Sequence, residues 1–93
     1  GNTNISYKLE NRYDTYMEVP VYMCQYGGEV TVNIVVDRLG RVLAAKIDEE
    51  TSKSDDGCLQ RAAIQAAQNT RFNNSQQAPK AQNGSITFRF VSQ

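Results

Sequence analysis

The side chains with the most chemical potential in this sequence are two cysteines, Cys24 and Cys58. A lone pair in a small chain suits one disulfide formed in an oxidising compartment. Two alternatives stay open. Cys58 could be a reactive thiol of lowered pKa near a helix N-terminus, or both cysteines could be buried thiols that act as small apolar side chains. We predict the disulfide, which on the chain-entropy model would stabilise the fold by about 3–4 kcal/mol.

The remaining polar residues give little support for catalysis. The chain has no histidine and no tryptophan. Its sequence contains no glycine-rich phosphate loop, nucleophile elbow or metal-spaced cluster. A Ser–Lys pair is conceivable only within the run Ser52-Lys53-Ser54, which is better suited to capping a helix. We therefore predict that the protein is not an enzyme and takes no cofactor or metal.

An acidic stretch, residues 48–56, invites comparison with a calcium-binding loop. It lacks the alternating Asp/Asn ligands and the central glycine of an EF-hand loop. We predict instead a solvated loop that leads into a helix. Ser52 or Ser54 would be the N-cap, and Asp55 and Asp56 would lie at the positive end of the helix dipole.

Length and charge limit the classes of partner. The 93 residues are enough for one small core, and ten basic residues balance ten acidic ones. Without a basic stripe, nucleic acid and anionic membranes are disfavoured as partners. The longest aliphatic run, Ile34 to Val36, is far too short to span a bilayer. The chain is expected to be a soluble piece of a longer protein, with an N-terminal arm over residues 1–18 and a domain over residues 19–93.

The elements that must position these residues begin with a hairpin. Apolar and polar residues alternate from Val30 to Asp37, as in a half-buried strand. The turn follows at residues 37–40, where Gly40 can take a positive φ. A second strand runs from Arg41 to about Asp48, and its apolar positions change phase after Val42, which predicts a β-bulge.

A helix is predicted from Cys58 to Ala67, running on to Arg71-Phe72. Its apolar stripe follows helical spacing at Leu59, Ala62, Ala63, Ala66, Ala67 and Thr70. A stripe made mostly of alanine lets the helix approach the sheet closely. Ile64 lies off this stripe, and we expect a loop or the N-terminal arm to cover it.

The final strand is predicted over Ser85 to Val91. Ile86, Phe88 and Phe90 would face the core, and Thr87, Arg89 and Val91 would face outward. The order strand, strand, helix, strand leaves a small open sheet, so we expect this last strand to lie at an edge and to accept an extended peptide. Arg89 would guard the unpaired edge against self-association.

All five tyrosines lie in the first twenty-six residues. Ile5, Tyr7 and Leu9 alternate with polar residues and predict a short strand, Ile5–Glu10. We expect this aromatic segment to pack over one face of its own sheet, since amphipathic aromatics cover half-exposed sheets. The alternative is that it is a surface for a partner. A further alternative is that the N-terminal strand itself, or a second copy of the domain, occupies the edge of the last strand.

Three motifs follow one another in a fixed order: GEVxVxIxVDxxGRV from Gly28 to Val42, AAxxA from Ala62 to Ala66, and Arg71-Phe72 at the helix end. With Cys-Leu at the helix start and Gly-Ser-Ile-Thr-Phe-Arg-Phe at the end, the chain resembles a divergent branch of the C-terminal domain family of TonB, the periplasmic energy transducer. The resemblance covers about residues 19–92. It implies an α+β domain of two layers, one helix on a small antiparallel sheet.

The resemblance also implies partners. The family's domain captures the TonB box, a short peptide of an outer-membrane receptor, by adding it as a strand, and so couples inner-membrane energy to transport. The matching strand here is Ser85 to Val91. The ExbB–ExbD motor is met through a membrane helix that this chain lacks, so the domain would be the periplasmic part of an inner-membrane-anchored protein. A homodimer is a further partner class.

Two other functions stay open at this point. One is a structural or interaction domain of an envelope protein that has the same fold without energy coupling. The other is a secreted inhibitor with a cystatin-like layout of one helix on a sheet.

Overall fold

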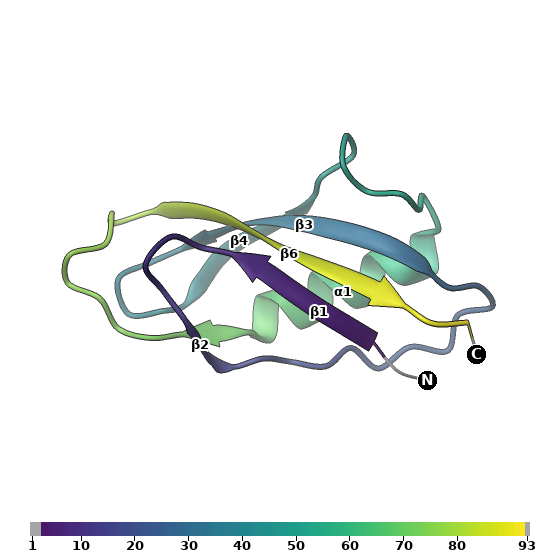
Figure 1. The fold of residues 1–93 in the computed structure, drawn as a ribbon, viewed down its shortest axis with the longest axis horizontal. Helices are drawn as coiled ribbons and strands as arrows, with labels where there is room; N and C mark the ends of the chain where they lie inside the picture. The colour runs from purple at the N-terminus through teal and green to yellow at the C-terminus, as the bar shows by residue number, and fades with distance from the viewer. Residues whose placement is uncertain (1–2, 93) are drawn as a thin grey trace.

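The chain forms a four-stranded antiparallel sheet with one helix across one of its faces (Figure 1). The computed structural model describes residues 3–92. Its elements in chain order are β1 (Thr3–Lys8), β2 (Asp14–Tyr16), β3 (Gly28–Val36), β4 (Val42–Ile47), α1 (Gly57–Asn69), β5 (Arg71–Phe72) and β6 (Gln82–Phe90). The predicted α+β fold with an N-terminal strand is confirmed.

The order of strands in the sheet is β1-β6-β3-β4, so β3 and β6 are the central pair. Alternate residues of these two strands point at the helix and are almost completely buried. They are Val30, Val32, Ile34, Val36, Ile86, Phe88 and Phe90. The opposite face of the sheet carries mainly polar residues, and no second layer formed by residues 3–92 covers it (Figure 1). The period-two alternation of the sequence thus decides which face is the core.

The hairpin between β3 and β4 forms as predicted. The partners shift register between Val35 and Val36, so that Leu43 is the extra residue of a bulge in β4. Gly40 has a φ of 88° in the turn. An added Cβ there would lie 1.9 Å from the Phe72 carbonyl oxygen, so glycine is required on two grounds.

The helix α1 presents its alanine-rich stripe to β3 and β4. Leu59, Ala63, Ala66 and Ala67 are buried as predicted, whereas Ala62 is half-buried. Residues of this stripe other than Leu59 are small, so the facing valine, isoleucine and phenylalanine side chains supply most of the buried apolar surface. The predicted stripe therefore holds within the helix, with its weakest member at Ala62. The helix ends earlier than predicted, at Asn69, so Thr70 is its C-cap and Arg71–Phe72 form the strand β5.

The helix caps differ from the prediction. Asp56 is the N-cap, and its carboxylate accepts hydrogen bonds from the backbone N–H groups of Cys58 and Leu59. Ser52 instead bonds to both backbone groups of Thr31 in β3. The neighbouring Ser54 accepts the N–H of Asp56. The serines thus fix the loop before the helix, and the aspartate that follows them caps it.

The connecting segment, residues 9–27, joins β1 to β3 by running back along one side of the helix (Figure 1). Its strand β2 pairs with β5. Near its end Cys24 forms a disulfide with Cys58 at the helix start, with the two Cα atoms 5.8 Å apart. The predicted disulfide is confirmed, and it fixes the end of this segment to the helix.

The tyrosines of the N-terminal region divide into two groups. Tyr7 and Tyr22 pack edge-on against the core residues Phe72 and Phe90. The other three, Tyr13, Tyr16 and Tyr26, are exposed. The expectation that this segment covers its own sheet therefore holds only for the first two.

The last strand differs from the prediction in one decisive respect. β6 is not an edge strand, because β1 pairs antiparallel with it from Thr3–Phe90 to Lys8–Ser85. The edge expected at Ser85–Val91 is wrong for this structure, and the alternative occupant, the N-terminal strand, fills it. The physical reason is that a free ladder of N–H and C=O groups beside β6 is satisfied by the chain's own alternating N-terminal segment.

Candidate functional site

The two sides of the sheet are the candidate interaction surfaces, and the chain completes them differently. We call the side formed by β1 and the connecting segment (residues 9–27) the closed flank. The side formed by β4 and the adjoining face of α1 we call the open flank (Figure 1). The predicted site, Ser85–Val91, belongs to the closed flank.

A hydrogen bond between β3 and the residue that follows β4 shows to which side each residue of β6 points its N–H and C=O groups. Asp48 donates its backbone N–H to the Thr31 carbonyl, so Thr31 turns its main-chain groups toward β4. In antiparallel pairing the direction alternates along a strand. Val30 and Val32 therefore turn toward β6, and their partners there are Phe88 and Ile86.

By the same alternation, Ser85, Thr87 and Arg89 turn their main-chain groups away from β3 and toward β1. Their partners in β1 are Lys8, Ser6 and Asn4. These three β6 residues are the positions where any strand added at the closed flank would take its hydrogen bonds.

The predicted guard residue has a more specific partner than expected. The Arg89 guanidinium donates two hydrogen bonds to Glu29 Oε1, at 3.0 and 3.2 Å, across the β6–β3 pair. Lys53 lies 3.9 Å from the other oxygen of that carboxylate. Arg89 thus belongs to a small ion-pair network on the face of the sheet opposite the helix, and it is not an isolated charge at a sheet edge.

The strand β1 is held by pairing and by one aromatic anchor. The Tyr7 ring packs on Phe72, and its hydroxyl donates to Asp14 at 2.8 Å. Ile5 and Tyr7 are only partly buried against the core, and Asn4, Ser6 and Lys8, which alternate with them, are exposed. β1 therefore rests on β6 with one face half in solvent.

The most important residue of the closed flank that sequence reasoning missed is Arg12. It is 7% exposed, and its guanidinium donates to Gln82 Oε1 and to the carbonyls of Asp37 and Asn73. Nε has no partner among the described residues. Arg12 thereby joins the connecting segment to the hairpin turn and to the loop before β6. One arginine in a polar stretch gives no signal of such a role.

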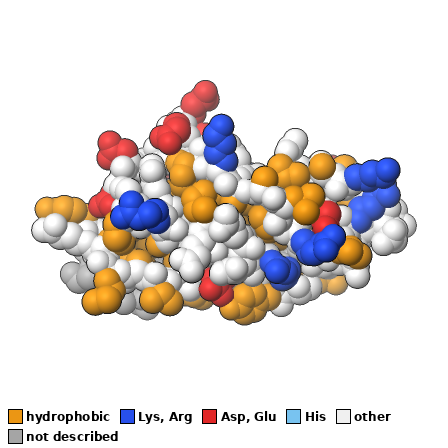
Figure 2. Space-filling view, turned by 180° about the vertical axis from the view of Figure 1, so that it is seen from behind, with side chains coloured by type: hydrophobic (Ala, Val, Ile, Leu, Met, Phe, Trp, Pro, Cys, Tyr) orange, Lys and Arg blue, Asp and Glu red, His pale blue; other side chains and the backbone are white. Residues whose placement is uncertain are grey.

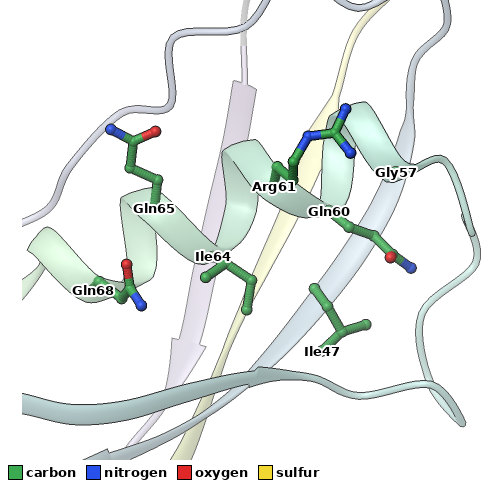
Figure 3. A pocket seen from close by; sticks show the side chains of 7 residues that line it. All are labelled: Ile47, Gly57, Gln60, Arg61, Ile64, Gln65 and Gln68. Carbon is green, nitrogen blue, oxygen red and sulfur yellow. The ribbon is translucent and has the colours of Figure 1, made fainter.

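The open flank contains a groove of about 560 Å³ between β4 and α1. Figure 3 shows Ile47 and Ile64 pointing toward one another across it, with Gln60 and Gln68 one helical turn to either side of Ile64. Ile64 was expected to be covered by a loop or the arm. That expectation is wrong, because the connecting segment runs along the other side of the helix.

The main chain of β4 is also free on this side. Lys46 and Ala44 share the phase of Asp48 and turn toward β3, so Ala45 and Ile47 turn their N–H and C=O groups outward. Among the described residues no strand pairs with that edge. The open flank thus offers a free ladder beside an apolar groove.

Charge is distributed unevenly along the open flank. Figure 2, seen from the helix side, shows acidic side chains gathered on a projecting loop and basic side chains gathered toward the opposite end. The loop is residues 48–56. The basic end includes Arg41 and Arg71, whose main chains pair in a single antiparallel β-bridge. The groove between them is lined by one charged residue, Arg61.

Two carboxylates of this flank are structural. Burial raises the pKa of Asp37, but hydrogen bonds from the Arg41 backbone and guanidinium outweigh it and hold the pKa below its ordinary value. Hydrogen bonds from Thr51 and Glu50 lower the pKa of Asp48. Both residues shape turns, which agrees with a solvated loop rather than a cation site.

Within residues 3–92, no group of three or more Cys, Asp or Glu side chains is placed to hold a metal ion. Both cysteines are in the disulfide, so neither is a thiol nucleophile. No helix in the same part of the chain is long and apolar enough to cross a membrane.

A comparison with known families decides the relationship. The family model described as the Gram-negative bacterial TonB protein C-terminal matches residues 23–91. The chain belongs to this family. This match supports a periplasmic interaction domain. The matched residues do not include β1 or most of the connecting segment. Neither the search of curated proteins nor that of solved structures finds a significant match.

Proposed function

We propose that this TonB-like domain binds the TonB box of an outer-membrane receptor by strand addition at Ser85–Val91, in the position that β1 occupies here. The observation that carries the proposal is the place of β1. It lies outside residues 23–91, which match the family, and it covers the outer side of β6, the strand that the family resemblance assigns to peptide capture. β1 would then be a built-in competitor of the peptide.

Replacing β1 with a peptide should cost little free energy, which favours the role of β1 as a competitor. An incoming peptide would replace the pairs that β1 makes at Ser85, Thr87 and Arg89 with equivalent main-chain bonds. The net gain is then the difference between two similar ladders, so affinity in the intact chain should be modest. The half-exposed face of β1 limits the side-chain packing that exchange would cost.

Energy coupling is the second part of the proposal. In the TonB scheme the domain transmits force from the ExbB–ExbD motor to a receptor, through a membrane helix that precedes the domain. A ladder of main-chain bonds along β6 suits this task, because a pull along the strand loads several hydrogen bonds together. The other candidate is an interaction domain of the envelope that uses the fold without coupling.

Titration of the ¹⁵N-labelled chain with a TonB-box peptide tests the site. The expected result is that amide shifts concentrate at Ser85, Thr87 and Arg89 and in β1. Shifts confined to the connecting segment, residues 9–27, or none at millimolar peptide, would reject the proposal and favour the interaction domain.

A variant of β1 sharpens the test. Ser6→Pro removes the N–H that pairs with Thr87, so the competitor is weakened while β6 keeps its own sequence. We expect peptide affinity to rise at least fivefold. Ser6→Ala keeps the backbone N–H and is the matched control, for which affinity should stay unchanged. Equal affinities in the two variants would show that the peptide does not exchange with β1.

A further inference from the structure

A pocket of about 420 Å³ lies where β1 ends and β6 begins, which is the usual size of a small-molecule site. Its walls come from the turn after β1, the loop before β6 and the first residues of β6, all at one end of the sheet (Figure 1). We propose that this pocket, the Arg12 pocket, binds a small sugar acid. The ligand's carboxylate would pair with Arg12, and its hydroxyl groups would bond to the surrounding amides. The site is distinct from the peptide site at Ser85–Val91, and neither proposal depends on the other.

Arg12 is a buried cation without a counter-ion. None of the ion pairs formed by residues 3–92 includes it. Its hydrogen bonds go to neutral acceptors, which are the side-chain amide of Gln82 and the carbonyls of Asp37 and Asn73. Taking a charge out of water is costly when only neutral groups replace the lost hydration. An anion in the pocket would supply the missing opposite charge.

The guanidinium also has hydrogen-bond donors that are not used. Of its five N–H groups, three donate to the acceptors above. Nε–H and one N–H of Nη1 are left without an acceptor among the described residues. Nε is covered by protein atoms, so a ligand's carboxylate would bond first to the free N–H of Nη1. Charge-assisted bonds of this kind are stronger than those between neutral groups.

The loop that forms one wall is fixed in place without the ligand. Arg12 and Arg38 donate to the carbonyls of Asn73 and Ala78, and Arg38 accepts the N–H of Ser75. These bonds hold the loop, residues 73–81, against the hairpin turn. A preformed wall reduces the conformational entropy that binding would cost.

The opposite wall is a tight turn after β1. The N–H of Arg12 donates to the Leu9 carbonyl, which closes the turn. Asn11 has a φ of 60°, a left-handed conformation that asparagine adopts more readily than most residues. The turn reverses the chain, so that Arg12 is buried while Asn11 stays exposed at the rim.

The rest of the lining indicates a hydroxyl-rich ligand with one negative charge. Asn11, Gln77 and Asn83 bring amides that can both donate and accept, as hydroxyl groups do. The apolar part of the lining is small, Ala78 and Pro79, and does not suit a large apolar side chain. The one lining carboxylate, Glu10, is exposed and opposes an anion, so a carboxylate is favoured over the more highly charged phosphate.

Titration of the ¹⁵N-labelled chain with D-glucuronate at low salt tests the site. Saturable shifts are expected in the turn, residues 9–12, and in the loop, residues 73–81, together with a shift of the Arg12 Nε–H signal. D-Glucose has a similar ring without the carboxylate, and acetate has the carboxylate without the ring. Each should bind with at least tenfold lower affinity than glucuronate.

Three results would overturn the proposal. The first is that tens of millimolar glucuronate cause no saturable shift at the pocket. The second is that acetate or inorganic phosphate binds as tightly as glucuronate, since the site would then take any anion. The third is that N-acetylalanine binds more tightly than glucuronate, which would identify a site for a peptide carboxylate.

Two neighbouring glutamines offer matched variants that leave the bonds of Arg12 in place. Gln77 lines the pocket and Gln76 does not, although both are exposed. Gln77→Glu brings a negative charge to the wall and should lower glucuronate affinity at least fivefold, whereas Gln76→Glu should change it less than twofold. Glu10→Gln removes the opposing charge and should raise affinity at least twofold. Equal affinities in the three variants would mean that Arg12 only joins the loops and that the pocket binds no anion.

Discussion

The closed and open flanks of this sheet differ in whether other segments of the described chain cover them. On the closed flank, β1 pairs with β6, the disulfide ties the connecting segment to α1, and Arg12 joins that segment to two loops. On the open flank, no strand among the described residues pairs with the outer edge of β4, which lies beside the groove. Side-chain hydrogen bonds of Asp37 and Asp48 shape the turns at the two ends of β4. The contrast locates stability on the first flank and an unused interaction surface on the second.

Functional consequences follow from this asymmetry. A partner at β6 must compete with a strand that is already in place, so its binding is a choice between two states. A partner at β4 has no competitor within the described residues. Its binding free energy is therefore reduced only by the cost of ordering and desolvation. Substitutions should therefore affect folding strongly on the closed flank and association mainly on the open flank.

The largest effect is expected at the disulfide. Cys24 and Cys58 are separated by 34 residues, and a loop of that size is worth about 4 kcal/mol on the chain-entropy model. The double variant Cys24→Ser/Cys58→Ser should lose about that much free energy of unfolding in urea titration. A loss below about 1 kcal/mol would mean that the closed flank does not depend on this link. The oxidised protein should also show no free thiol by mass spectrometry without reduction.

Arg12 is expected to come next. Arg12→Met keeps much of the apolar stem but leaves Gln82 and the carbonyls of Asp37 and Asn73 without their donor. Buried acceptors left unpaired should cost about 2–3 kcal/mol in total. Arg38→Met is the control, because Arg38 is less buried and donates to only one carbonyl, that of Ala78. Equal losses in the two variants would contradict a special role for Arg12.

The two sides of α1 can be compared directly by enlarging one residue on each. Ala66 is 1% exposed and lies under the connecting segment and against the core. Ala66→Leu should overpack that site and cost about 1–3 kcal/mol. Gln68→Leu, on the exposed open flank, should change the unfolding free energy by less than about 0.5 kcal/mol. Dilute samples keep association out of the measurement, and an unchanged denaturant midpoint for Ala66→Leu would mean the helix face is wrongly assigned.

Much of this architecture is predictable from local sequence. Period-two alternation gives β3 and β6 and their buried faces, helical spacing gives the stripe of α1, and the phase change after Val42 gives the bulge. The family match over residues 23–91 agrees with the motifs that carry the resemblance. These features can be predicted from the sequence because each depends on residues close together in the chain.

The features that escaped prediction depend on residues far apart. Nothing in the alternation of Ile5 and Tyr7 says which strand they will pair with, and the pairing with β6 spans almost the whole chain. Arg12 is buried by loops that come sixty residues later. The groove beside Ile64 exists because the connecting segment takes the other side of the helix. Long-range pairing, rather than local propensity, decides which edge of this sheet is free.

The smallest effect is expected from the turn at the basic end of the open flank. Hydrogen bonds from Arg41 hold the pKa of Asp37 below its ordinary value, against the effect of burial. Such a carboxylate stabilises the fold fully above its unfolded pKa of about 3.9 and loses that contribution as the pH falls through the lower folded value. The Arg41 side chain is 60% exposed, so the pair should contribute about 0.2–1 kcal/mol. Asp37→Asn should therefore lower the urea midpoint slightly at pH 7, and the difference from the parent chain should shrink as the pH falls below about 3.9. A variant that loses as much stability at pH 2 as at pH 7 would show that the charge of Asp37 does not hold the turn.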